Sequence, residues 1–297
     1  MVRMVSRVEV AIRSDALLGE CPRWEPVSRR LLWVDIEGRA LHVSDPARGE
    51  DQAIPLWSRI GAASWTTADD TILVALADRL ALLQLADNSL RTLTEIPHAG
   101  HMRLNDGACD AAGRFWVGSM ALAETAGVAA LYRYADGVLE RVLERVTLSN
   151  GLGWSPDGTR MYYVDSLEYR IDVFDFDLES GTISDRRQFA AIDRSDGIPD
   201  GLALDDEGGV WLALWGGRAV RRYDAEGRLD YVVDVPAQNV TACGFGGDDR
   251  RSLFITTAAP DGSVFVADAG VAGPPPRPFQ LTGRSTAPSE AEPTSAR

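Results

Sequence analysis

Six short apolar and aromatic runs recur along the 297-residue chain at nearly constant spacing, and this repetition is the feature that most limits its possible folds. The runs cover residues 31–36, 72–77, 114–120, 160–165, 210–215 and 252–257. Aligned on Trp33, Leu73, Trp116, Tyr162, Trp211 and Phe254, they are separated by 40, 43, 46, 49 and 43 residues. Each is followed by a second strand-like run, and most by a third that is more charged. A repeat of this length with about four short strands is typical of a propeller blade. The chain is therefore predicted to be all-β and to form a six-bladed β-propeller around a central channel.

The pattern also indicates how the propeller begins and ends. A parallel α/β fold would need amphipathic crossover helices, and the sequence has no such pattern. Residues 7–12 (RVEVAI) alternate like a strand, so we expect them to complete the last blade from the N-terminal side. We expect one propeller domain over residues 1–281. Residues 282–297, rich in Pro, Ser, Ala and Glu, are predicted to be a disordered tail.

Charge and cysteine content exclude several function classes. The net charge is −14, from 44 acidic and 30 basic residues, so the field would repel a phosphate backbone and no nucleic-acid partner is expected. The three cysteines are odd in number and show no metal-binding spacing, which favours neither a disulfide framework nor a zinc module. Sparse cysteine suits a reducing compartment. No signal peptide or membrane span is apparent, so we expect a cytoplasmic monomer or weak homo-oligomer with no membrane partner.

Polar residues recur at one phase of the repeat. Eleven to thirteen residues before each aligned position stand Glu20, Ala62, Asn105, Asn150, Asp200 and Cys243. The innermost strand of each blade lines the channel, so residues at one phase can meet there. Two carboxylates and two amides form an oxygen-rich set that suits Ca²⁺, Mg²⁺ or Mn²⁺. Each residue alone is also explained as a turn former, but their common phase favours a metal-binding channel. Pro199 and Gly201 are expected to stiffen and clear the backbone around a ligand at Asp200.

At these residues the chain resembles the gluconolactonase family of six-bladed propellers that includes regucalcin (senescence marker protein). The matching stretches span residues 18–258: LGECPRW, RLNDGACDAAGRFWVGSM, LSNGLGWSPDGTRMYYVDS, GIPDGLALDDEGGVWLALWGG and CGFGGDDRRSLFITTA. The resemblance implies one divalent metal (Ca²⁺, Mg²⁺, Mn²⁺, Zn²⁺ or Fe²⁺) bound by Glu20, Asn150 and Asp200. It implies hydrolysis of a sugar-acid lactone, such as a glucono-, xylono-, arabinono- or galactono-lactone, to the aldonic acid. Asp200 would also be the catalytic base, and Arg103 and Asn105 would contact the substrate or a metal-bound water.

The chain departs from the family pattern at two positions. Cys21 stands where the family's first motif carries glycine, next to the ligand Glu20. In some relatives an acidic residue shortly after the GSM-like stretch contacts substrate, and here only Glu124 is available for that role.

Two other functions remain open beside lactone hydrolysis. One is a regucalcin-like propeller that binds calcium for regulation with little catalysis, and the other is a propeller hydrolase of esters or phosphotriesters. A serine triad has no GxSxG motif to support it, and no phosphate-binding loop is present. Arg103 and Asn105 favour an enzyme over metal storage, since storage alone has no need of them.

Overall fold

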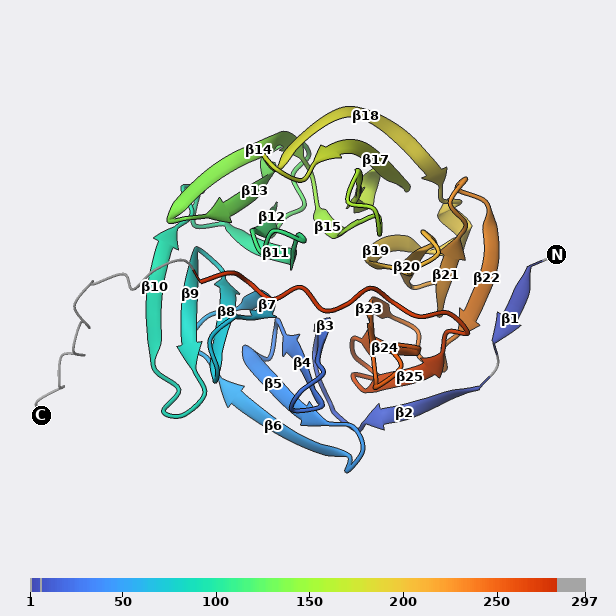
Figure 1. The fold of residues 1–297 in the computed structure, drawn as a ribbon, viewed down its shortest axis with the longest axis horizontal. Helices are drawn as coiled ribbons and strands as arrows, with labels where there is room; N and C mark the ends of the chain where they lie inside the picture. Colours follow the sequence, from blue (N-terminus) through green and yellow to red (C-terminus); the bar gives the residue numbers. More distant parts are fainter. Residues whose placement is uncertain (1, 6, 282–297) are drawn as a thin grey trace, which may run out of the picture.

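Six antiparallel sheets surround a central axis in the computed structural model, which describes residues 2–5 and 7–281 (Figure 1). The predicted six-bladed β-propeller is confirmed. The disorder predicted for residues 282–297 lies outside the described residues.

Each blade has a set of four strands in order from the axis outward; the N-terminus supplies the outermost strand of the sixth blade and a fifth, edge strand to the fifth blade. The first three blades contain β3 (Gly19–Glu25), β4 (Arg30–Asp35), β5 (Ala40–Asp45) and β6 (Glu50–Pro55); β7 (Ile60–Trp65), β8 (Thr71–Leu76), β9 (Arg79–Gln84) and β10 (Leu90–Glu95); β11 (Met102–Cys109), β12 (Phe115–Ala121), β13 (Ala129–Ala135) and β14 (Val138–Val146). The last three contain β15 (Ser149–Trp154), β16 (Arg160–Asp165), β17 (Arg170–Asp177) and β18 (Thr182–Ala191); β19 (Ile198–Leu204), β20 (Val210–Trp215), β21 (Ala219–Tyr223) and β22 (Leu229–Asp234); β23 (Val240–Gly246), β24 (Ser252–Thr257) and β25 (Val264–Asp268).

The runs that reveal the repeat are the second strands of the blades, and they form the core. Trp33, Trp116 and Trp211 are fully buried at equivalent places. The indole N–H of Trp116 donates to Asp110 at 2.9 Å, and that of Trp211 donates to Asp205 at 2.7 Å. Both aspartates belong to the turn between the first and second strands, so the turn and the core of the third and fifth blades are tied together. A buried indole bonded in this way retains its apolar contacts without an unsatisfied donor.

The N-terminus closes the ring. β2 (Val8–Ile12) pairs antiparallel with β25, which confirms the closure predicted for residues 7–12. Upstream of it, β1 (Arg3–Val5) adds to the edge of the fifth blade in parallel with β22. This second pairing was not predicted, because three residues carry no strand periodicity. The N-terminal segment therefore covers the outer edges of both the fifth and sixth blades, edges that would otherwise be open.

A C-terminal segment, residues 270–281, crosses one end of the channel, and we call it the strap. In Figure 1 it is the red coil that runs from β25 across the middle of the ring to the second blade. Its backbone bonds to the fifth blade through Ala272 and to the second blade through Phe279, whose carbonyl accepts from Thr67 at 3.0 Å. Phe279 is buried and stacks on Tyr134 of the third blade, with ring centroids 6.0 Å apart. The strap thus joins blades on opposite sides of the axis.

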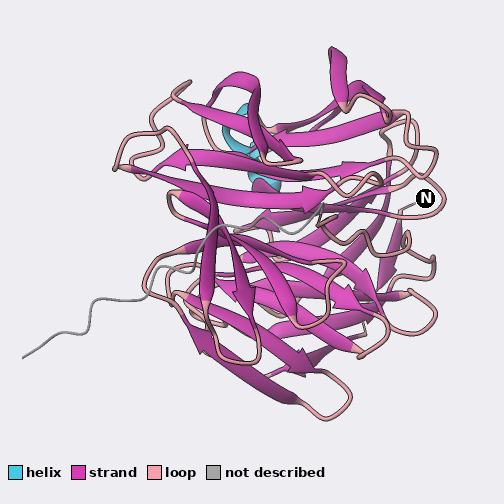
Figure 2. Ribbon diagram, turned by 60° about the vertical axis from the view of Figure 1, so that its left-hand side comes forward, coloured by secondary structure: helices cyan, strands magenta, loops and turns pink. Residues whose placement is uncertain are grey.

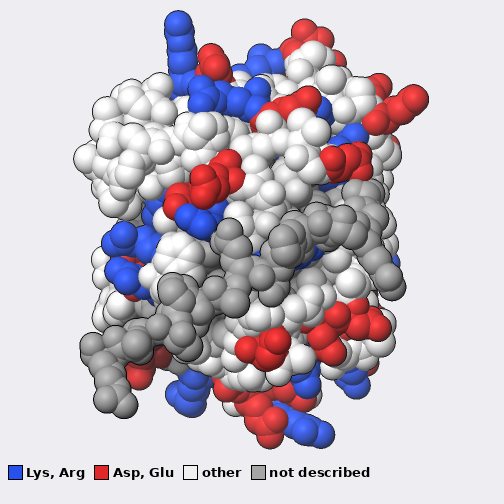
Figure 3. Space-filling model, turned by 90° about the vertical axis from the view of Figure 1, so that its left-hand side faces the viewer, with Lys and Arg blue, Asp and Glu red and all other residues white. Residues whose placement is uncertain are grey.

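Strands and loops make up nearly all of the described chain (Figure 2). The helical content is two single turns, η1 (Ser166–Glu168) and η2 (Arg194–Asp196), and neither is long or apolar enough to cross a membrane. The face shown in Figure 3 carries acidic and basic side chains interspersed.

Candidate functional site

Every inner strand breaks its pairing register near the same end of the channel. In β11 the break falls between Leu104 and Gly107, in β15 between Ser149 and Leu152, and in β19 between Pro199 and Leu202. The polar residues Asn105, Asn150 and Asp200 lie inside these breaks, and Glu20 lies at the start of the one in β3. A β-bulge re-aims the side chain of the extra residue and is common beside active sites. The four residues predicted from the repeat phase therefore occupy equivalent bulges.

Glycine follows Asn150 and Asp200 because the inner strands approach one another closely there. A Cβ on Gly151 would lie 2.7 Å from the Asp200 carbonyl oxygen, and one on Gly201 would lie 2.5 Å from the Ala242 Cβ. Real Cβ atoms do not tolerate such contacts. The expectation that Gly201 clears space for a ligand is replaced by a packing reason, since the space it leaves is filled by β23.

Six polar residues gather at this end, and we call them the ring cluster: Glu20, Arg103, Asn105, Asp106, Asn150 and Asp200. Each is less than a tenth exposed. Hydrogen bonds orient both amide side chains of the ring cluster. The Asn105 side-chain N–H donates to the Ser149 carbonyl at 2.7 Å, and that of Asn150 donates to the Ser166 hydroxyl at 3.1 Å. Arg103 donates to the side-chain oxygen of Asn105, which places the guanidinium beside the amide.

Some buried polar atoms of the cluster have no hydrogen-bond partner among the described residues. They are Oδ1 of Asn150, Oδ1 of Asp200 and Nε of Arg103. The structural aspartates differ: Asp205 accepts from the Glu207 and Gly209 N–H groups at 2.9 and 2.8 Å as well as from Trp211. An unpaired buried oxygen costs about 1–3 kcal/mol, more when it is charged. Two such oxygens on neighbouring bulges fit a cation that would bind them both.

Burial and repulsion between like charges raise the pKa values of Glu20 and Asp200. Burial raises the pKa of Glu20 well above its usual value, and the nearby Asp200 and Asp106 raise it further. Burial also raises the pKa of Asp200, as does Asp106, while the neighbouring Asn150 and Arg103 act in the opposite direction. For Arg103, burial lowers the pKa to about 10, so the guanidinium stays charged near neutral pH. Like charges held together in a buried site are typical of functional sites.

No group of three or more His, Cys, Asp and Glu side chains within residues 2–5 and 7–281 is arranged to hold a metal ion. A metal at the ring cluster would therefore need the Asn150 amide oxygen beside the carboxylates of Glu20 and Asp200. Carboxylate and amide oxygens are ligands that hard divalent cations accept. The residues present fit such an ion, with the two unpaired oxygens as the clearest sign.

Two charged residues in the channel were missed by the sequence reasoning. Asp106 accepts a hydrogen bond from the Gly107 N–H at 2.7 Å, and the Arg23 guanidinium lies 3.8 Å from its carboxylate. Arg23 also donates to the Gly107 carbonyl at 2.9 Å. Asp106 directly follows Asn105. The comparison of repeat positions considered one residue per blade and therefore did not identify Asp106. A bulge exposes two consecutive residues to the channel, so the residues adjacent to each counted position are the signal that could have identified it.

Cys21 does not turn its thiol toward a metal ligand. Its Sγ donates to the Ala63 carbonyl at 3.4 Å in the second blade, and burial raises the pKa of the thiol to about 11. Its φ is +57°, a left-handed conformation that glycine adopts without strain. This backbone explains why glycine suits the position.

Glu124 is not one of the buried residues of the cluster. It occupies the exposed loop between β12 and β13, where its N–H donates to the Ala121 carbonyl at 2.8 Å. The structure thus brings together five of the six predicted site residues and leaves Glu124 in this loop.

Comparisons with known proteins agree with this architecture. The family model described as the SMP-30/Gluconolactonase/LRE-like region matches residues 18–259. A Bacillus subtilis (strain 168) protein named putative sugar lactone lactonase YvrE is 35% identical over 280 residues, covering 89% of this chain and 95% of that protein. Regucalcin from Gallus gallus is 34% identical over 283 residues, covering 88% and 94%. Among solved structures, the calcium-binding protein regucalcin from Agrobacterium tumefaciens str. C58 is 28% identical, with a TM-score of 0.90 and coverage of 94% and 99%.

Proposed function

The chain belongs to the SMP-30/gluconolactonase/LRE-like family, and from this premise we propose that it is a lactonase that hydrolyses a sugar-acid lactone at the ring cluster. Glu20, Asn150 and Asp200 would hold one divalent metal ion. The observation that carries the proposal is the pair of unpaired buried oxygens on Asn150 and Asp200.

The metal would polarise the lactone carbonyl and acidify a water molecule. The candidates are Ca²⁺, Mg²⁺, Mn²⁺, Zn²⁺ and Fe²⁺. Calcium is favoured because a relative with a TM-score of 0.90 is described as calcium-binding, and because Ca²⁺ accepts carboxylate and amide oxygens in irregular geometry.

Asp200 is proposed as the base of the reaction. It would accept a proton from the attacking water as the water oxygen bonds to the carbonyl carbon, and the ring C–O bond would then break. The alkoxide that leaves takes a proton back, so that one water is added and the aldonic acid is released.

Arg103 and Asn105 are proposed to position the substrate. The guanidinium is buried and charged, and its Nε has no partner among the described residues. It can donate to the developing oxyanion or to sugar hydroxyls. Asn105 holds the guanidinium through its Oδ1 and is itself held by Ser149. This connected pair favours catalysis over calcium storage alone. Glu124 remains a proposed substrate contact from its exposed loop at residues 122–128.

The test measures acid release from a panel of glucono-, galactono-, xylono- and arabinono-lactones. Each lactone is assayed before chelation, after chelation, and after refilling with each of the five ions. We expect hydrolysis of at least one lactone, its loss on chelation and its recovery with one or more ions. A protein that binds calcium tightly and hydrolyses no lactone would instead match the regucalcin-like regulatory alternative. Hydrolysis that survives complete removal of metal would contradict the proposed role of the ion.

A further inference from the structure

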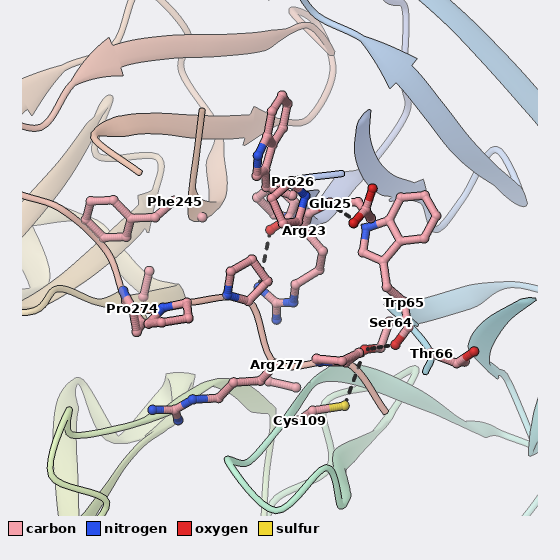
Figure 4. A pocket seen from close by; sticks show the side chains of 18 of the residues that line it. Arg23, Glu25, Pro26, Ser64, Trp65, Thr66, Cys109, Phe245, Pro274 and Arg277 are labelled. Atoms are coloured by element: carbon pink, nitrogen blue, oxygen red, sulfur yellow. Dashed lines mark hydrogen bonds between the residues drawn. The ribbon is translucent and has the colours of Figure 1, made fainter. Parts of the chain in front are cut away.

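A cavity of about 930 Å³ lies at the end of the channel opposite the ring cluster, beneath the strap. We call it the strap cavity. Its lining includes Arg23, Leu152, Ala203 and Phe245 from the inner strands and Pro274 and Arg277 from the strap (Figure 4). None of Glu20, Asn150 and Asp200 lines it. Its volume falls in the range of about 300–1,000 Å³ that small-molecule sites occupy. The cavity is therefore large enough for a ligand of its own.

Arg23 separates this cavity from the ring cluster. It lies three positions beyond Glu20 on β3, and its guanidinium is held by the Gly107 and Pro22 carbonyls at 2.9 and 3.3 Å. Asp106, 3.8 Å away, supplies the opposite charge. Figure 4 shows Arg23 in the middle of the cavity lining, between Phe245 and Trp65. These contacts tie the Arg23 guanidinium to the inner strands, and it forms part of the floor of the cavity.

The walls are mostly apolar and aromatic. Trp24, Trp65, Trp154 and Phe245 line the cavity from the first, second, fourth and sixth blades, and Pro274 covers it from the strap. Such walls favour a flat apolar body, which aromatic side chains contact over a large area.

Arg277 supplies a cation that is unpaired within the described part of the chain. It is half-buried, and it makes no hydrogen bond or ion pair with any residue in the described ranges. The charge of Asp110 raises the pKa of Arg277. The Asp110 carboxylate, however, already accepts hydrogen bonds from Arg114 at 2.7 Å and from Trp116 at 2.9 Å. Burial lowers the pKa of Arg277, the direction expected for a cation that lacks a compensating anion. The acids that line the cavity, Glu25, Asp69 and Asp70, form no ion pair with it.

We propose that the strap cavity binds a small organic anion with a flat apolar body, an aromatic carboxylate or sulfonate. Its rings would pack between Trp65 and Phe245, and its acid group would pair with Arg277. An anion at this position would give the guanidinium the charged partner it lacks, and such charge-assisted hydrogen bonds are among the stronger polar contacts in proteins. The site is independent of the ring cluster and of lactone hydrolysis.

The test uses two dyes that share a ring skeleton but differ in charge. Anilinonaphthalene sulfonate is anionic, and phenylnaphthylamine lacks the sulfonate. Fluorescence titration of the full chain is expected to show one sulfonate dye per chain. Arg277→Gln should weaken binding of the anionic dye about tenfold or more, because a hydrogen bond to a charged group is lost. The same change should leave the neutral dye within about twofold.

Arg228→Gln is the matched control, since Arg228 is 71% exposed and already paired with Asp224 and Glu226. It should change neither dye. If Arg277→Gln and Arg228→Gln bind the anionic dye equally well, the proposal is wrong.

A second variant places the dyes in the cavity. Ala203 lines it and is only partly buried, so Ala203→Trp adds a large side chain to that space. Both dyes should then lose binding at least tenfold while the melting temperature shows a folded protein. A folded Ala203→Trp variant that binds both dyes like the unchanged protein would overturn the location. Lactone hydrolysis measured on the same samples should be retained in Arg277→Gln, which keeps this test separate from that of the ring cluster.

Discussion

The two ends of the central channel are built from the same six inner strands, yet they satisfy their buried polar groups in opposite ways. Near the strap, Asp110 and Asp205 fill their hydrogen-bonding capacity with turn N–H groups, an indole and an arginine. At the ring cluster, Asn150 and Asp200 keep oxygens that have no hydrogen-bond partner within residues 2–5 and 7–281. A residue type alone does not separate these cases, since both ends use aspartate. Asp110 and Asp205 thus complete the fold with saturated carboxylates, whereas the unsaturated oxygens of Asn150 and Asp200 are available to bind a ligand.

The largest loss of activity is expected from a substitution of Asp200 in the ring cluster. Asp200→Asn removes the proposed base and a carboxylate ligand with almost no change of shape, so kcat for lactone hydrolysis should fall by about 10²–10⁴. Steady-state kinetics on the best lactone measures it. Asp224→Asn, in a turn of the fifth blade where the carboxylate binds Arg228 at 2.8 Å, is the control and should keep full activity. Full turnover by Asp200→Asn would show that the base is another group.

The next largest effect is a loss of stability, expected from a change in the strap at the opposite end of the channel. Phe279→Ala removes the buried strap side chain that stacks on Tyr134 and should cost about 3–5 kcal/mol. For a chain of this size that lowers the melting temperature by roughly ten degrees, measurable by calorimetry. Val27→Ala, at a side chain 91% exposed, should leave it unchanged. Below the melting transition kcat should stay the same, and a matching loss of kcat would show that the two ends are coupled.

A smaller effect tests how the substrate is held. Arg103→Lys keeps a positive charge but loses the planar fork and its bond to Asn105, so kcat/KM should fall about 10- to 100-fold. Arg48→Lys, at a side chain 72% exposed, is the control. If Arg103→Lys hydrolyses lactones at the unchanged rate, the guanidinium has no part in substrate binding.

The smallest effect tests the close approach of the inner strands. Gly201→Ala would bring a Cβ to 2.5 Å from the Ala242 Cβ and should cost about 1–3 kcal/mol. Gly100→Ala is the matched control, because a Cβ there would meet nothing within 4 Å. Denaturant unfolding of the two variants gives the comparison. Equal stability would mean that β19 and β23 can separate at no cost.

The sequence predicts most of the propeller because every blade repeats the same period. The second strands are continuous apolar runs, and counting back from them locates Glu20, Asn105, Asn150 and Asp200 at the channel. The strap was not predicted, since residues 270–281 follow no strand or helix period and are held by a few backbone bonds to distant blades. The pairing of β1 with β22 likewise depends on a long-range contact.

Within the site, the limits of sequence reasoning are geometric. The bulges that aim two consecutive residues at the channel leave no pattern, so Asp106 was passed over beside Asn105. The role of Gly201 was misread for the same reason, because its neighbour β23 is 40 residues away in the chain. The partner of Asp106, Arg23, reaches it from another blade. Such contacts follow from tertiary packing, and periodicity carries no information about them.

The central claim is that the unpaired oxygens of the ring cluster hold a divalent ion. Anomalous diffraction from a crystal of the full chain soaked in Mn²⁺ tests it most directly. We expect one strong peak within about 2.6 Å of oxygens from Glu20, Asn150 and Asp200. A peak that lies elsewhere, or no peak at a saturating Mn²⁺ concentration, would contradict it.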